Sequence, residues 1–495
     1  MAAREGLGRT RILVLLASAA VLVSIPSDLV PMLRGPAPYP PEWQWAFRPD
    51  GPARPLLAAA AGALGLLALL WASGTGWARE RPTAARRALV IGAVLLGCGL
   101  QLGLLAREPG SPLRTLLSRA RSRSFTSYHT VAISPEARDP GEFLRRHAER
   151  LPDLSQSAKH AATHPPGPVL YYRAAVALCE VSPSLTEGLL EAAGVPDRAF
   201  RPPTTRATRA AALLGALLLG LLGTLASWPI AGLAAGLGVG DLAAGRLAVL
   251  WALLPGPALM VPQFDQALAL PVVGTTALLL AAQAGSGSAL GRAGAAGILG
   301  GAALLTSYGA AAFLAIGGFA AMAAGGGRAG LRRSAAVVSV ATGVAGLVAF
   351  GLPALLGHQP LRALLTALSI HRELYTAPRS YTLWLLFNPL DLAIFLGVPV
   401  ALGGLFALVR SARRRGSRAG VGPLDRFRWA VFGGLTVLLL LGVTRGEVGR
   451  LWIPLMPLLL VASLGGPDAP DRRESLVDGV LLAALTLILG SYWIT

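Results

Sequence analysis

Apolar runs alternate with short polar segments along most of the chain. Many of these runs are about 20 residues long and nearly free of charge, which is the length that an α-helix needs to cross the hydrocarbon core of a bilayer. Because backbone polar groups find no partners in lipid, we expect an all-α, polytopic transmembrane helix bundle of about 13 spans. The expected spans cover residues 12–33, 55–74, 88–106, 209–234, 245–263, 267–284, 293–308, 309–325, 334–356, 382–409, 428–444, 450–464 and 476–494.

One long segment, residues 107–208, breaks this alternation with polar residues and strong turn and capping signals. Within it, residues 139–154 place apolar side chains at helical spacing with charges on the other face, which predicts an ordered helix near the membrane surface. Residues 164–182 contain a proline pair at their start and are too short and too polar for a clean span, so we expect an interfacial helix there. The chain then divides into N-terminal transmembrane helices (1–106), a large external loop with juxtamembrane helices (107–208) and a transmembrane helix bundle (209–495).

Composition argues against an ordinary soluble protein. Only 14% of the 495 residues are charged and 54% are hydrophobic, whereas soluble domains carry about 25% charged residues. The net charge is +19 and Lys159 is the only lysine, but the arginines alternate with the expected spans and form no single stripe, which argues against a nucleic-acid partner. Cys98 and Cys179 stand far apart in apolar surroundings, so we expect no disulfide framework, no metal site and no cofactor.

Arginine placement predicts the orientation of the chain, because basic residues are enriched in cytoplasmic loops. With the N-terminus in the cytoplasm, the arginine-rich segments at 79–87, 328–333 and 410–428 all fall on the cytoplasmic side. The loop 107–208 then lies outside. We therefore expect a multi-pass protein of the cell membrane, with membrane lipids among its partners and its active side external.

Several polar residues remain on the expected external side. Arginines there run against the charge rule, and an anion is the obvious reason for them. The guanidinium group is a planar fork of donors that matches phosphate, and a lipid phosphate or diphosphate can reach such a place within a bundle of helices. A solvated ion-pair cluster that caps two helices is the alternative. The candidate residues are Tyr128, Asp139, His160 and His164 in the loop, Asp265 in PGPALMVPQFDQ, Arg372, Arg379 and Tyr381 in IHRELYTAPRSYTLWLLFNPLD, and Arg445, Glu447 and Arg450 in TRGEVGRLWIPLMP.

His160 and His164 stand four positions apart, but Pro165 and Pro166 begin a new element directly afterwards. The two histidines therefore need not share a helix face, and hydrogen bonding or substrate contact is a better prediction for them than metal ligation. Asp265 lies at a span boundary, where a carboxylate is costly unless it is paired or wetted. It predicts a cavity, although an aspartate at a hydrated helix end would give the same pattern.

Four short motifs carry a resemblance to a known family. THPPGPVLYY closes the long loop, LPGPALMVPQFDQ places its aspartate at an external mouth, and RSYTLWLLFNPLD and RGEVGRLWIPLMP follow towards the C-terminus. Together they resemble the GT-C superfamily of integral-membrane glycosyltransferases, in particular the enzymes of mannosyl and arabinosyl type that depend on dolichyl or polyprenyl phosphate. The resemblance covers roughly residues 88–464.

The resemblance implies transfer of a sugar from a lipid-linked donor, a polyprenyl-phosphate carrier, to a glycan or lipid acceptor on the outer face. An external carboxylate would take the proton of the acceptor hydroxyl, while arginines in place of a metal would stabilise the departing lipid phosphate. It implies that Asp265 is a second acid and that Arg445 and Arg450 bind the phosphate.

The carboxylate that serves as the base stays open. The family places it early in the first large external loop, but the matching stretch here, RSFTSYHTVA, has none. If the two N-terminal spans are an addition to the family fold, Asp139 is the expected base. If they are the family's own first spans, Asp28 is.

Two other classes of function remain as alternatives. A transporter or lipid flippase predicts charged residues in the middle of spans together with repeat symmetry, and the chain shows no internal repeat. If the chain is instead a non-catalytic protein of an envelope-assembly complex, we expect that its external acids can be replaced without loss of function.

Overall fold

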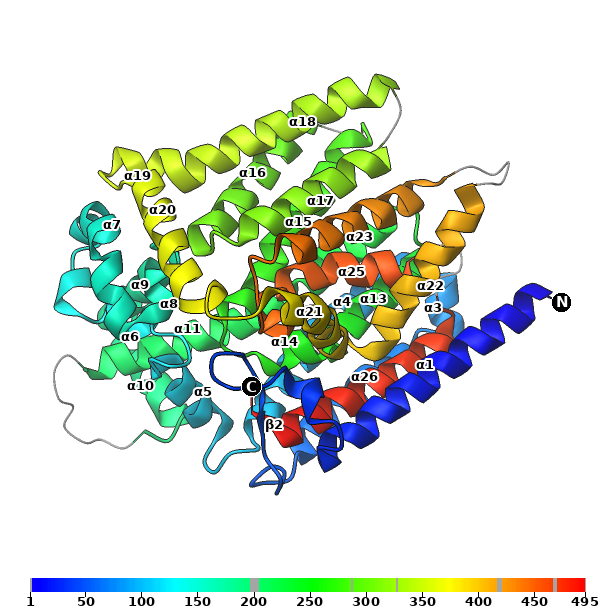
Figure 1. Cartoon of the computed structure of the whole chain (residues 1–495), viewed down its shortest axis with the longest axis horizontal. Helices are drawn as coiled ribbons and strands as arrows, with labels where there is room; N and C mark the ends of the chain where they lie inside the picture. The colour runs from blue at the N-terminus through cyan, green and yellow to red at the C-terminus, as the bar shows by residue number, and fades with distance from the viewer. Residues whose placement is uncertain are drawn as a thin grey trace.

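Helices make up nearly all of the structure, a computed structural model that describes residues 2–195, 204–285, 288–325, 328–415, 421–465 and 470–494. Among these residues the only strands are β1 (Ala46–Phe47) and β2 (Trp493–Ile494), which pair antiparallel. The predicted all-α class is thus confirmed. The longer helices run side by side as a bundle, and a group of short helices gathers at one end of it (Figure 1).

Seven helical segments are long and apolar enough to cross a membrane, which indicates an integral membrane protein. A bent pair, α21 (Tyr381–Leu396) and α22 (Val398–Arg415), turns by 113° at its break and could provide an eighth span. The seven lie in α1 (Ala2–Ser27), α4 (Pro82–Leu105), α11 with α12 (Arg206–Leu225 and Ser227–Gly236), α15 (Phe264–Gln283), α16 (Ala289–Thr306), α18 with η3 and α19 (Arg328–Gly346, Leu347–Gly351 and Leu352–Leu355) and α26 (Arg472–Tyr492).

The count of about 13 spans is not confirmed, because several expected spans form shorter or broken helices. Three apolar helices have fewer than 18 residues: α2 (Leu57–Ala72), α17 (Ala310–Gly325) and the segment that joins η5 (Ile453–Leu455) to α25 (Met456–Leu464). A break at Leu254 separates α13 (Asp241–Leu253) from α14 (Pro255–Leu259), and α23 (Pro423–Leu441) carries three charged residues in its first two turns. The remaining elements of the bundle are η1 (Pro31–Arg34), α3 (Gly76–Glu80), α20 (Pro360–His371), η4 (Arg372–Thr376) and α24 (Val448–Leu451).

The bundle has a buried centre and an apolar periphery. All nine residues of α25 are buried, and α15 packs against α11, α12, α16 and α17. At the periphery, large apolar side chains stay exposed, among them Leu16 (63%) and Leu355 (81%). Apolar surface on this scale is unusual for a soluble monomer but is what a lipid-facing helix presents.

The helices at one end of the bundle form what we call the cap, residues 112–192 (Figure 1). The helix expected over 139–154 is α7, whose apolar face is buried and which packs against α20. The helix expected over 164–182 is α9, which has 15 residues and is therefore about 22 Å long, too short to cross about 30 Å of hydrocarbon. The helices of the cap are α5 (Pro112–Arg121), α6 (Tyr128–Ala132), η2 (Pro135–Ala137), α7 (Pro140–Ser157), α8 (Lys159–Ala162), α9 (Gly167–Val181) and α10 (Pro183–Ala192).

Two glycines allow α9 to dock closely on the bundle. A Cβ at Gly167 would lie 2.0 Å from the carbonyl oxygen of Leu305, so only glycine fits there. On α11, a Cβ at Gly215 would lie 2.5 Å from the ring of Tyr172, and the neighbouring Tyr171 donates a hydrogen bond of 2.7 Å to the Gly215 carbonyl. The proline pair before α9 thus leads into a helix that lies along α11.

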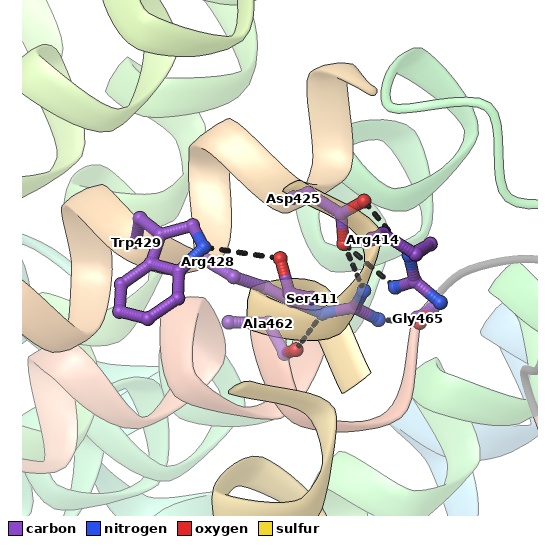
Figure 2. Close-up of polar contacts among 7 residues, drawn as sticks. All are labelled: Ser411, Arg414, Asp425, Arg428, Trp429, Ala462 and Gly465. Atoms are coloured by element: carbon purple, nitrogen blue, oxygen red, sulfur yellow. Dashed lines mark hydrogen bonds and ion pairs between the residues drawn. The ribbon is translucent and has the colours of Figure 1, made fainter. Parts of the chain in front are cut away.

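The far end of the bundle from the cap is held by two arginines (Figure 1 and Figure 2). Arg414 of α22 makes a two-pronged ion pair with Asp425 of α23, at 2.8 and 3.1 Å. Arg428 donates to the same carboxylate at 2.9 Å and to two carbonyls at the end of α25, those of Ala462 and Gly465. Because the last carbonyls of a helix have no partners within it, Arg428 both caps α25 and ties it to its neighbours.

Candidate functional site

A small pocket lies where α8 of the cap, the η4 region and the turn before α24 meet. Its volume is about 60 Å³, room for roughly four or five water molecules and so for a group of the size of a phosphate. We call it the arginine pocket. It is lined by His160, Thr163, His164, His371, Tyr375, Arg379, Thr444, Arg445, Gly446, Glu447, Arg450 and Leu451.

Arg450 is held between two carboxylates. Its Nη2 lies 2.8 Å from Glu447 Oε2, and its Nε lies 3.8 Å from Asp265 Oδ2. Glu447 also pairs with Arg379, whose Nη2 lies 3.6 Å from Oε1. All four side chains are at most 16% exposed, so these charges are poorly screened by water. Asp265 does not line the pocket itself but lies 3.8 Å from Arg450, which does, so we place it at the edge of the pocket.

Arg445 adds a positive charge that no carboxylate balances among the described residues. Its guanidinium donates to three carbonyls instead, those of Thr376 (3.0 Å), Arg379 (2.6 Å) and Gly442 (3.1 Å). Tyr381, whose hydroxyl donates to the Leu440 carbonyl, places its ring 5.6 Å from the same guanidinium. The pocket and its edge thus hold three arginines against two carboxylates.

The three histidines that line the arginine pocket, His160, His164 and His371, supply neutral hydrogen-bond acceptors. His164 Nδ1 lies 2.8 Å from the His160 carbonyl, which can only accept, so Nδ1 carries the proton and Nε2 is left with a lone pair. By the same reasoning His160 donates from Nε2 to the Ser124 carbonyl at 3.3 Å. Burial and then the nearby Arg450 lower the pKa of His160 to about 4, and burial and then the neighbouring His160 lower the pKa of His164 to about 3. Burial and then Arg379 also lower the pKa of His371, so all three rings are neutral at pH 7.

Backbone strain marks one residue that lines the arginine pocket, Glu447, and one that supports α8 behind it, Ser127. Ser127 and Glu447 have φ values of 57° and 58°, in the left-handed region that side chains other than glycine rarely adopt. Ser127 is fully buried, and its Oγ accepts a hydrogen bond from the Ala161 amide, which joins α6 to α8. The adjacent Tyr128 packs its ring 5.5 Å from His164 and 5.1 Å from Phe264. Strain of about 1–3 kcal/mol at each such residue persists only where the surroundings hold it, as at binding sites.

One face of α21 positions the turn that carries Glu447 and Arg450. Asn388 Nδ2 donates to the Thr444 carbonyl at 2.8 Å, and its Oδ1 accepts from the Gly446 amide at 3.2 Å. Asp391, one helical turn further, accepts from the Gly449 amide at 2.9 Å. Gly446 has a φ of 96°, which explains glycine at this position. The NPLD motif is thus the support of the site.

A segment near the N-terminus, residues 42–45, completes this support, and sequence reasoning missed it. Glu42 accepts from the Ser380 amide at 2.8 Å and from Trp384 Nε1 at 2.6 Å. Trp45 Nε1 donates to Asp391 at 2.8 Å, and the Trp43 ring lies 5.9 Å from the Arg379 guanidinium. The available signal was the run EWQW, an acid among tryptophans between two apolar stretches.

Three predicted site residues do not reach the arginine pocket. Asp139 caps α7 by accepting from the amides of the two residues Gly141 and Glu142, which lowers its pKa, and it is exposed. Asp28 pairs with Arg34 at 2.9 and 3.0 Å. Arg372 is exposed and does not line the pocket. The structure brings together Tyr128, His160, His164, Asp265, Arg379, Arg445, Glu447 and Arg450, with Tyr381 in contact with Arg445.

Within the described ranges, no group of three or more histidine, cysteine, aspartate or glutamate side chains could hold a metal ion. Comparisons with protein families, with curated proteins and with solved structures give no match for this chain. The arrangement of side chains itself is therefore what indicates a function. Buried arginines in excess of carboxylates favour an anion, and neutral imidazoles beside them favour a partner that donates hydroxyl hydrogen bonds.

Proposed function

We propose that the chain is a membrane glycosyltransferase of GT-C type, which moves a sugar from a polyprenyl-phosphate carrier to an acceptor. The observation that carries the proposal is the arginine pocket itself. A phosphate would balance the charge of Arg445 and compete with Glu447 for Arg450. The sugar next to the phosphate would donate its hydroxyl hydrogens to the neutral histidines.

The proposed chemistry is a single displacement at the anomeric carbon of the donor sugar. The acceptor oxygen forms a bond to this carbon while the bond from the carbon to the phosphate oxygen breaks. Glu447, which lines the pocket, takes the proton of the acceptor hydroxyl once phosphate occupies Arg450. Arg445 and Arg450 stabilise the lipid phosphate that leaves. Glu447 thus replaces Asp139 and Asp28 as our preferred base, because it lines the pocket and they do not.

The proposal includes an orientation, with about 13 passes and the N-terminus in the cytoplasm. It is supported by the placement of the cap and of the end of α22, rich in arginine, at opposite ends of the bundle (Figure 1). The test is labelling of single cysteines after replacement of Cys98 and Cys179. Asp139→Cys should react with an impermeant maleimide from outside and Arg413→Cys only after the membrane is opened. Labelling of both from the same side would contradict the orientation.

The activity test uses the full chain in nanodiscs with radiolabelled polyprenyl-phosphate mannose and polyprenyl-phosphate arabinose. We measure release of polyprenyl phosphate for the parent, Glu447→Gln, Arg450→Gln and the exposed control Arg372→Gln. General-base catalysis raises a reaction rate by about 100-fold to 10,000-fold. The rate of donor cleavage should therefore fall by at least about 100-fold in Glu447→Gln, while Arg372→Gln keeps the parent rate. Thermal unfolding of each variant separates a lost site from a lost fold.

The same experiment decides between the proposed enzyme and its alternatives. Turnover that is equal in all four proteins, or absent with both donors, would contradict the proposed glycosyltransferase activity. Movement of the intact donor across the bilayer without sugar release would instead identify a lipid flippase. A chain that neither moves nor cleaves the donor would fit a non-catalytic protein of envelope assembly.

A further inference from the structure

A second cavity, of about 460 Å³, lies on the cap and is used by nothing described so far. We call it the cap groove. It runs between α6 with η2 on one side and α7, from Phe143 to its end, on the other. It is lined by Arg123, Thr130, Val131, Ser134, Glu136, Phe143, Arg146, Glu149, Arg150, Asp153, Leu154, Ser157 and Ala158.

The polar groups of the cap groove bear both signs of charge and are weakly engaged with the protein. Arg146 lies 3.5 Å from Glu142, and Glu149 lies 3.7 Å from Arg362, with all four side chains more than half exposed. Exposed pairs of this kind contribute about 0–1 kcal/mol and open readily. Of the remaining arginines, neither Arg123 nor Arg150 donates a hydrogen bond to any described residue. Three arginines and three carboxylates therefore line the groove with no net charge.

The other groups of the cap groove complete a distinctive combination. Hydroxyls of Thr130, Ser134 and Ser157 stand among the charged side chains, while Val131 and Phe143 form a buried apolar floor. Donors and acceptors thus alternate around an apolar base. A sugar ring is complementary to such a surface, because each of its hydroxyls both donates and accepts hydrogen bonds while the C–H face of the ring is apolar.

The cap groove shares a thin wall with the arginine pocket. On α6, Tyr128 contacts His164 of the pocket while Thr130 lines the groove. Where α7 gives way to α8, Ala158 lines the groove and His160 lines the pocket, two residues later. A hydrogen bond of 3.3 Å from His160 Nε2 to the Ser124 carbonyl oxygen joins two segments of this wall. A chain molecule bound in the groove would therefore end close to the pocket.

We propose that the cap groove binds carbohydrate, and that it holds the neutral oligosaccharide part of the acceptor. The second half of the proposal rests on the glycosyltransferase function proposed above. An acyl chain does not fit a groove lined by six charged side chains. An acidic glycan is disfavoured because the three carboxylates offset the three arginines. The part of the acceptor that the cap groove holds is thus a neutral glycan and not an acyl chain.

The test measures binding of free hexasaccharides to the full chain in phosphatidylcholine nanodiscs, by saturation-transfer NMR and titration calorimetry. The probes are neutral maltohexaose, mannohexaose and arabinohexaose, with a hyaluronan hexasaccharide as the acidic probe. The variants are Arg150→Ala and Asp153→Asn in the groove. The matched control is Arg138→Ala, an exposed arginine of the cap that does not line the groove.

We expect at least one neutral hexasaccharide to bind, with at least tenfold weaker binding to each groove variant and unchanged binding to Arg138→Ala. Absence of binding by all three neutral probes, preference for hyaluronan, or equal binding to the groove variants would overturn the proposal. Arg450→Gln separates the two proposals, since it should bind glycan like the parent while losing donor cleavage. If the parent binds glycan but does not cleave the donor, the proposal for the cap groove is supported and the proposed enzyme activity is contradicted.

Discussion

The most direct consequence of the arginine pocket is that Arg450 holds two carboxylates together. At an effective dielectric constant of 20, Coulomb's law gives about 6 kcal/mol for the 2.8 Å pair with Glu447 and about 4 kcal/mol for the 3.8 Å pair with Asp265. Desolvation of the three groups offsets much of this sum. Arg450→Leu leaves the nearly buried Asp265 without its cation and leaves Glu447 with Arg379 alone, at 3.6 Å, and breaking a buried pair costs about 3–5 kcal/mol. We expect this loss in the free energy of unfolding.

The measurement is unfolding in bicelles by steric trapping for the parent, Arg450→Leu, Glu447→Leu and the double variant. Because the double variant no longer buries a Glu447 that has lost its 2.8 Å partner, its loss should be smaller than the sum of the single losses by about 2 kcal/mol or more. Arg372→Leu, an exposed arginine, is the control and should change the free energy by less than about 0.5 kcal/mol. Additive losses from the two single changes would refute the coupling that we infer from the geometry.

Three further predictions follow from buried polar groups. Asn388→Leu should lower the free energy of unfolding by about 2–4 kcal/mol, because the Thr444 carbonyl and the Gly446 amide each lose a buried partner. A shift in unfolding temperature no larger than that of a surface variant would contradict this. Burial, with a nearby second histidine, lowers the pKa of His147 to about 3, below its unfolded value of about 6.5. The unfolded chain therefore binds the proton first, and the cap should lose about 2 kcal/mol between pH 6.5 and pH 5. His147→Phe should abolish that loss, and hydrogen exchange of α7 that is equally acid-sensitive in this variant would count against it. Asp425→Leu should lower the free energy of unfolding by about 3–5 kcal/mol, because the buried Arg428 loses its carboxylate partner (Figure 2). Thermal unfolding measures this, and an unchanged midpoint would show that the network is dispensable.

The parts of the fold that could be predicted are those that local pattern determines. The face of α7 is set by spacing within a few turns, and the proline pair at 165–166 fixes the start of α9. The convergence of His160 with Arg450 was expected only because both were assigned to one side of the membrane. The structure places them in one pocket.

The parts that could not be predicted depend on distant contacts or on competing local roles. Nothing near Glu42 indicates that its partners lie at Ser380 and Trp384. Asp139 was a candidate base, yet an aspartate before Pro-Gly-Glu is also a strong helix N-cap, and that local role prevails. The count of about 13 spans is not confirmed for a third reason, since hydropathy does not register breaks such as that at Leu254.

The hydrogen bond between Trp45 and Asp391 joins positions 346 residues apart. A ribosome that adds about 5–20 residues per second needs roughly 20–70 s to make the intervening chain. During that time the EWQW segment is without its partners. Assembly of the site is therefore one of the last events in biogenesis, and a nascent chain stalled before α21 would present a tryptophan-rich segment to any insertase or protease that it meets.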